Sequence, residues 1–381
     1  MVLLTYIIPF ITAIVLLLFF RKKTMWWEYV VVICPSLLLC LLIECCMKEV
    51  NTDDVEYLGY YVEKITYTED WDEWIHETCT RRVRIGTDKH GNAIYTTHTY
   101  DCSYREYHPQ RWTYTLNNGE TEYFYNKEEF DKVLNKLKAE PKFVDMHRHY
   151  YTKDGDRYEY YWDKRREHIY TMTQKHHYTN YIKSSHSLFK YEEITEENAK
   201  KLGLYDYPEI VDYDQNPVIG YPVDKSSVDA VKYINGFFGM RHQFRLFVLI
   251  YPDKDISVVD KQKSYWQGSN KNELVVCVGY NTKKQSIDWC ESFSWADSPT
   301  LEVKTKDYFL THNKLDIVGY CDYLKPMIKI YWQRKKFEDF KYIDVELSDT
   351  QVTWLFIIIL LYNIGISLWV IFNSFENDDN E

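Results

Sequence analysis

The sequence predicts an α+β protein in which three transmembrane helices anchor a strand-rich extramembrane domain with aromatic β-hairpins plus a smaller α/β subdomain. Two long apolar runs open the chain and a third lies near its end. Most of the 36 tyrosines lie between these runs, and aromatic side chains suit half-buried strands. After residue 226, apolar runs alternate with helical patterns, which is typical of parallel strands joined by helices.

The apolar runs are the candidate membrane spans. Val2–Phe20 has 19 residues without a charge, enough for a helix to cross a hydrocarbon core of roughly 30 Å. A cleavable signal peptide is the alternative, but the basic residues follow the run and no small-residue cleavage site ends it. In the second run, Trp26–Met47, Glu28 and Glu44 leave a short uncharged core, so failure to cross is the alternative there. Val352–Phe372 is the third span.

The basic turn between the first two runs sets the expected orientation. Positive charge in short loops stays on the cytoplasmic side, so Arg21, Lys22 and Lys23 predict a cytoplasmic turn. Residues 50–350 are then extracytoplasmic and the tail after residue 372 is cytoplasmic. The localisation expected is a multi-pass membrane protein with three spans in the lipid bilayer. If the second run does not cross, the large domain changes sides.

Composition divides the chain into six parts. Residues 1–47 form a two-helix transmembrane hairpin, and residues 50–190 form a β-hairpin-rich subdomain. Three prolines mark a linker at residues 191–225, and residues 226–350 form the α/β subdomain. Residues 352–372 form the C-terminal transmembrane helix, and residues 373–381 an acidic tail.

Turn chemistry predicts two hairpins in the first subdomain. Asn-Gly and Asp-Gly are strong signals for two-residue hairpin loops. A loop at Asn118-Gly119 sets Tyr114 opposite Tyr123. A loop at Asp154-Gly155 sets His149 opposite Tyr160.

A third turn, at His90-Gly91, sets Cys79 directly opposite Cys102. Antiparallel partners lie close enough for a disulfide, which an oxidising compartment would keep. Two unpaired thiols are the alternative, and moving the loop centre by one residue would set Cys79 against Tyr104.

Candidate chemistry is sparse, and no catalytic, nucleotide-binding or cofactor motif is recognised. Asp145, His147 and His149 alternate, so in a strand they share one face, and this set of side chains suits zinc. The alternative is histidines stacked on an aromatic face. Zinc is the one cofactor that these residues suggest, and otherwise no cofactor is expected.

The stretch Gln262–Glu273 is expected to form an exposed aromatic and polar surface for a ligand or partner, through Tyr265, Trp266, Asn270 and Asn272. An ordinary loop between a helix and a strand is the alternative. In this stretch and in the segment from His147 to Asp156, the chain resembles multi-span membrane proteins of bacteria and their phages. That resemblance implies no activity and assigns no functional residue.

The expected function is an integral membrane protein that presents an extracytoplasmic domain for binding, interaction or envelope structure, with a protein or glycan partner. The net charge of -11 argues against a nucleic-acid partner, which requires a basic face. The alternative is an enzyme, a metal-dependent envelope hydrolase that uses Asp145, His147 and His149.

Overall fold

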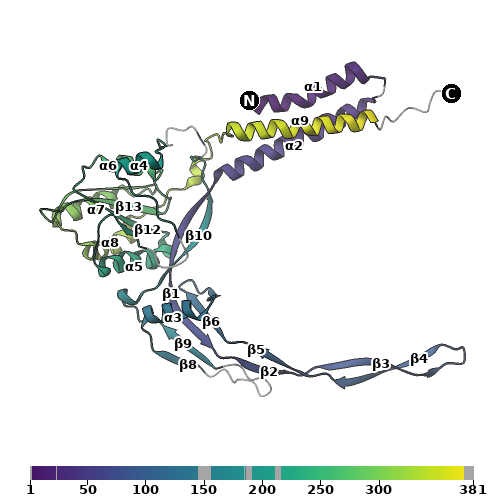
Figure 1. The fold of residues 1–381 in the computed structure, drawn as a ribbon, viewed down its shortest axis with the longest axis horizontal. Helices are drawn as coiled ribbons and strands as arrows, with labels where there is room; N and C mark the ends of the chain where they lie inside the picture. The colour runs from purple at the N-terminus through teal and green to yellow at the C-terminus, as the bar shows by residue number, and fades with distance from the viewer. Residues whose placement is uncertain are drawn as a thin grey trace. The chain divides into compact units, whose positions relative to one another are not determined.

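Helices account for 43% and strands for 29% of the structure, which confirms the mixed α and β class. The structure is a computed structural model that describes residues 2–22, 24–144, 156–183, 185, 191–210 and 216–372 (Figure 1). The chain divides into two units, the first made of residues 1–56, 176–194 and 335–381, the second of residues 57–175 and 195–334.

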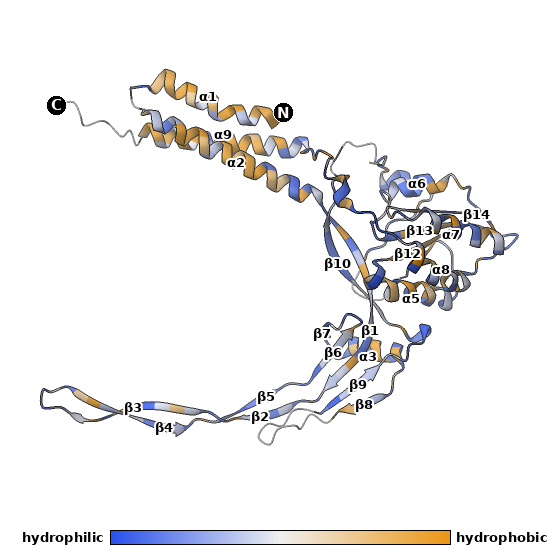
Figure 2. Cartoon of the chain, turned by 180° about the vertical axis from the view of Figure 1, so that it is seen from behind, coloured by the Kyte–Doolittle hydropathy of each residue, from blue (hydrophilic) through white to orange (hydrophobic). Residues whose placement is uncertain are grey.

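Three long apolar helices form the core of the first unit: α1 (Val2–Phe20), α2 (Trp26–Thr52) and α9 (Asp349–Phe372). All three are long and apolar enough to cross a membrane, as the sequence predicted, and Figure 2 shows apolar residues along each of them. They pack on one another through two clusters of apolar side chains. Asn363 of α9 donates a hydrogen bond of 2.7 Å to the Ser36 hydroxyl of α2.

The acidic residues of the second apolar run do not interrupt its helix. Glu28 lies in the first turn of α2, where its carboxylate accepts a hydrogen bond of 2.6 Å from the Met25 backbone N–H. This contact satisfies a donor that a helix start leaves open. Glu44 accepts a hydrogen bond from the Tyr6 hydroxyl and forms an ion pair of 2.7 Å with Lys48. The helix therefore continues through both acids.

Polar contacts surround the point where α2 passes into the first strand, within the first unit. His177 lies 3.0 Å from Asp53, and the Tyr178 hydroxyl donates to Asp54 over 3.0 Å. The Tyr178 ring also packs edge-on against Phe337, with centroids 5.3 Å apart, in the short 3-10 helix η2 (Phe337–Phe340).

Most of one sheet lies in the second unit, with the order β7-β6-β1-β9-β8, and β10 also pairs with β1. The strands are β1 (Asp53–Thr68), β6 (Arg111–Leu116), β7 (Thr121–Tyr123), β8 (Pro141–Val144), β9 (Arg157–Tyr161) and β10 (Thr171–Thr179). Helix α3 (Lys127–Leu137) buries its apolar stripe on one face of this sheet. The Asn126 side chain caps the helix by accepting from the Glu129 N–H.

The registers predicted for the hairpins at Asn118-Gly119 and Asp154-Gly155 are wrong. Tyr123 pairs with Thr113, and Tyr114 pairs with Glu122. The loop has three residues rather than two, because Gly119 takes a left-handed conformation with φ +89°. In the second hairpin Tyr160 pairs with Pro141, not His149. His149 and the Asp154-Gly155 turn lie outside the described residues.

A two-stranded ribbon connects β1 to β6. It consists of two paired segments, β2 (Trp71–Ile75) with β5 (Tyr104–His108) and β3 (Thr78–Thr87) with β4 (Ala93–Asp101). Cys79 and Cys102 lie at disulfide distance, with Sγ atoms 1.98 Å and Cα atoms 5.7 Å apart. The expected pair is therefore present, but its predicted register is wrong, since Cys79 pairs with Tyr100.

The turn of the ribbon explains this shift. The Asp88 backbone N–H donates to the Asn92 carbonyl over 2.8 Å, and the Asp88 carboxylate accepts the N–H groups of His90 and Asn92. The loop therefore has three residues, 89–91, instead of the two of a His90-Gly91 turn, and the strand pairing shifts by one position. A β-bulge between Arg84 and Gly86 adds another residue, so the two cysteines become diagonal neighbours.

The second sheet has the order β11-β12-β13-β14. Its strands are β11 (Val218–Ile219), β12 (Arg245–Pro252), β13 (Glu273–Asn281) and β14 (Ser286–Ser294), and the pair β12 and β13 is parallel, as predicted. The helices of this part are α4 (Glu196–Leu202), α5 (Lys225–His242), α6 (Val258–Tyr265), α7 (Pro299–His312) and α8 (Ile317–Tyr331). Helices α5, α7 and α8 share one apolar core with the strands.

Candidate functional site

Two neighbouring strands of the first sheet carry nearly the same five-residue pattern. Strand β1 reads Lys-Ile-Thr-Tyr-Thr over residues 64–68, and β6 reads Arg-Trp-Thr-Tyr-Thr over residues 111–115. The strands pair antiparallel, with Thr66 opposite Thr113. Lys64 therefore lies opposite Thr115, and Arg111 lies opposite Thr68.

Alternation along each strand separates a core face from an open face. Ile65 and Tyr114 are buried in the core that includes Phe130 and Val133 of α3. The threonines and cations project from the opposite face of the same strands. Strands β7 and β9 extend this open face on either side.

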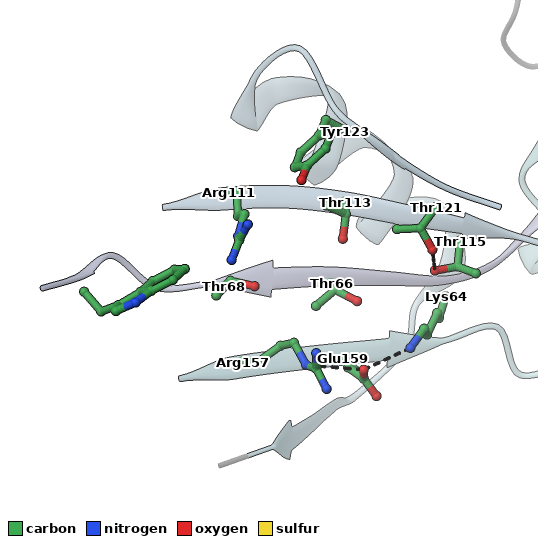
Figure 3. Close-up of a pocket in the computed structure, with 11 residues that line it drawn as sticks. Lys64, Thr66, Thr68, Arg111, Thr113, Thr115, Thr121, Tyr123, Arg157 and Glu159 are labelled. Atoms are coloured by element: carbon green, nitrogen blue, oxygen red, sulfur yellow. Dashed lines mark hydrogen bonds and ion pairs between the residues drawn. The ribbon is translucent and has the colours of Figure 1, made fainter. Parts of the chain in front are cut away.

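The open face lines a depression of about 420 Å³ (Figure 3), a volume in the range of ligand pockets. Threonines cover its floor, and charged and aromatic side chains surround them. The lining residues are Lys64, Thr66, Thr68, Trp71, Arg111, Thr113, Thr115, Thr121, Tyr123, Arg157 and Glu159. We refer to this surface as the threonine face.

One carboxylate lies among the three cations of the threonine face. The Glu159 carboxylate is 2.9 Å from Lys64 Nζ and 3.5 Å from Arg157 Nε. It also accepts a hydrogen bond from the Tyr161 hydroxyl. Burial by itself would raise the pKa of Glu159, but the hydrogen bonds from Tyr161 and Lys64 and the nearby positive charges outweigh burial and lower the pKa.

Arg111 has a different environment. Its guanidinium lies over the Trp71 ring at 4.9 Å from the centroid, and this ring stacks in turn on His108 at 4.6 Å. Among the described residues, Arg111 has no carboxylate within ion-pair distance. Stacking therefore fixes the position of the guanidinium while its N–H donors remain available.

These groups together suit an acidic, hydroxyl-rich ligand. Arginine binds carboxylates and phosphates through two parallel hydrogen bonds. Threonine hydroxyls both donate and accept hydrogen bonds, and Thr115 and Thr121 already lie 2.9 Å apart at their Oγ1 atoms. Tyr123 is 65% exposed, and its ring offers a flat apolar surface at the edge.

The predicted ligand surface before β13 was expected to be exposed, but two of its four residues are buried. Trp266 and Asn272 are 6% and 0% exposed. Trp266 donates through Nε1 to the Tyr205 carbonyl over 2.8 Å, and Asn272 donates to the Tyr57 carbonyl over 2.8 Å. Both residues therefore hold the fold together through their polar groups. The ligand role of these residues stays a prediction.

The other two residues of that predicted surface also bond within the chain. The Tyr265 hydroxyl donates to Asp206 over 2.6 Å. This hydrogen bond is the largest of the effects that together raise the pKa of Tyr265 to about 12. Asn270 donates to the Tyr207 hydroxyl over 3.0 Å. Its backbone N–H donates to Glu273 over 3.1 Å.

The predicted zinc ligands Asp145, His147 and His149 lie outside the described residues, so the metal site stays a prediction. Within the described part of the chain, one group of three ligand-type side chains lies within 4.8 Å of one another, namely Glu77, Cys79 and Cys102. Since its two sulfur atoms are at disulfide distance from each other, this group is not a metal site in the oxidised protein.

The threonine face was missed in the sequence analysis, although the repeated Thr-Tyr-Thr pattern was a signal for it. Of the topology residues, Arg21 and Lys22 lie in the turn after α1, and Lys23 is outside the described residues. Comparisons with protein-family models, curated proteins and solved structures find no match to the chain. The functional assignment therefore depends on the geometry of the site.

Proposed function

We propose that this protein is an integral membrane protein that binds an acidic saccharide on its threonine face. The observation that carries the proposal is the composition of that face. Three cations, five threonines and a single carboxylate line one depression, on a chain whose net charge is -11. A local positive charge on an acidic protein favours anionic ligands at this place and disfavours them elsewhere.

The ligand class follows from the combination of groups. Binding of an anion without hydroxyl groups would require only the cations of the threonine face. The row of threonines supplies hydrogen-bond partners for hydroxyl groups along the length of a sugar chain. The exposed Tyr123 ring can pack against the apolar face of a sugar ring. Uronic acids combine carboxylates with hydroxyls and apolar ring faces, so they match all three features.

A binding panel tests this proposal with the full-length protein in detergent. Oligogalacturonate is expected to bind, and maltooligosaccharide of the same length, which lacks carboxylates, is expected to bind at least tenfold more weakly. Added salt should weaken the oligogalacturonate complex, because screening acts on exposed charges. Equal affinity for the two sugars, or no binding of either, would contradict the proposal.

We also infer the sidedness of the protein. The basic turn after α1 favours a cytoplasmic location for that turn, and the close pair Cys79 and Cys102 favours an oxidising compartment for the large domain. Both observations support an extracytoplasmic domain.

Thiol mapping on intact cells tests the sidedness, with a membrane-impermeant reagent and peptide analysis of Cys79 and Cys102. Labelling of both cysteines after mild reduction, without lysis, is the expected result. Labelling that needs lysis but no reductant would place the domain in the cytoplasm.

A further inference from the structure

The ribbon formed by β2, β3, β4 and β5 leaves its long edges unpaired among the described strands. An isolated two-stranded ribbon is marginally stable in water, and an unpaired strand edge is a template for another strand. Apolar side chains on this ribbon are exposed, including Ile85 at 63% and Tyr107 at 60%. The ribbon therefore has the properties of a contact surface.

Charge is separated along the outgoing strand of the ribbon. Residues 70–77, which we name the acidic half, contain Asp70, Asp72, Glu73 and Glu77 and no lysine or arginine. Residues 81–89, which we name the basic half, contain Arg81, Arg82, Arg84 and Lys89, with Asp88 as the only acid. The two halves have nearly the same length.

In the acidic half, Asp72 forms an ion pair of 2.7 Å with Arg105, and Glu73 lies 3.0 Å from His108. The basic half has no comparable pair among the described residues. None of its four cations has a carboxylate within ion-pair distance in the described part of the chain. The carboxylate of Asp88 instead accepts backbone N–H groups in the turn. Within the described ranges, Arg84 donates to the Thr87 hydroxyl alone, over 2.9 Å. These cations are therefore available to an external acidic partner.

We propose that the partner is a second copy of this chain, bound antiparallel along the outgoing strand. Such a pairing is symmetric, since the same surface is used on both copies. When it is centred on Thr78, Asp72 of each copy faces Arg84 of the other. The acidic half of each copy then lies along the basic half of its partner, and the strand edges pair.

The first test reverses the charge of the basic half in the variant Arg81→Glu/Arg82→Glu/Arg84→Glu. Sedimentation equilibrium of the full-length protein in detergent measures the dimer dissociation constant. The wild-type protein is expected to dimerise, with weaker association at high salt. The variant, whose two halves are both acidic, is expected to dissociate at least tenfold more readily.

The second test reverses the acidic half in the variant Asp72→Lys/Glu73→Lys/Glu77→Lys. By itself this variant is also expected to lose the dimer. An equal mixture of the two variants should form a heterodimer, because each basic half again meets an acidic half. Recovery on mixing also shows that neither variant failed merely by unfolding.

The control variant Lys283→Glu/Lys284→Glu/Lys314→Glu changes the net charge by the same amount outside the ribbon and should dimerise as the wild type does. Three results would overturn the proposal: a wild-type protein that stays monomeric, a dimer that both ribbon variants retain, or variants that stay monomeric when mixed. A monomer whose ribbon binds a polyphosphate probe would instead identify the basic half as a polyanion site.

Discussion

Lys64 of β1 and Glu159 of β9 are diagonal neighbours on the threonine face, with Nζ and Oε1 2.9 Å apart. The Glu159 side chain is 7% exposed, and that of Lys64 is 29% exposed. A carboxylate held in this way offsets part of the positive charge that an acidic ligand would meet. It also ties β1 to β9 across the floor of the site.

Replacing this carboxylate should therefore separate binding from stability. Glu159→Gln removes the only negative charge from the lining, so affinity for oligogalacturonate should rise by about threefold to tenfold, while the protein loses about 1–3 kcal/mol of stability with the charged hydrogen bonds. Isothermal titration and urea denaturation measure the two effects. Weaker binding by the variant would show that Glu159 contacts the ligand favourably.

The same carboxylate predicts a pH dependence. Because the folded protein lowers the pKa of Glu159, its ionised form stabilises the fold at neutral pH, and that contribution is lost as pH falls below the ordinary glutamate range of about 4. The free energy of unfolding of the wild type should thus fall more steeply on acidification than that of Glu159→Gln. Parallel slopes for the two proteins would contradict this assignment.

The pair Cys79 and Cys102 closes a loop with a sequence separation of 23 residues. Loop-closure entropy predicts that Cys79→Ser/Cys102→Ser destabilises the ribbon by about 3 kcal/mol. Protease cleavage within residues 79–102 should become much faster. Cys45→Ser/Cys46→Ser, which replaces two free and exposed thiols, is the matched control and should leave cleavage of the ribbon unchanged.

Strand β1 and helix α5 approach each other at two glycines. A Cβ atom built on Gly239 would lie 2.2 Å from the Gly59 carbonyl oxygen, a backbone atom that cannot move aside easily. Gly239→Ala should therefore cost about 1–3 kcal/mol, even though alanine favours the helix. Gly86→Ala, at a position with nothing within 4 Å, is the control. Equal stability of both variants would contradict the close approach.

Long apolar patterns were predicted well from the sequence. The three apolar helices and the parallel pair β12 and β13 follow from unbroken hydrophobic runs, which fix an element without knowledge of its neighbours. Hairpin registers were predicted poorly, because a loop of three residues at Asn117-Asn118-Gly119 and a bulge near Ile85 each shift the pairing by one position. Such shifts depend on backbone geometry that dipeptide signals do not specify.

The candidate site was harder to predict for a related reason. The threonine face exists only because β1 pairs with β6 on one side and with β9 on the other, and all three strands are distant in sequence. Burial of Trp266 was missed because the carbonyl that satisfies its indole belongs to Tyr205. Contacts of this kind are visible only once the fold is known.

Two single arginine replacements, compared by titration with oligogalacturonate, test whether the threonine face binds the ligand. Arg111→Gln removes the stacked guanidinium of the threonine face, and Arg241→Gln removes an exposed arginine from the end of α5. A hydrogen bond to a charged group contributes about 1.5–3 kcal/mol, so Arg111→Gln should weaken binding about tenfold or more. Arg241→Gln should bind as the wild type does. Equal affinity of the two variants would contradict the assignment of the threonine face as the ligand site.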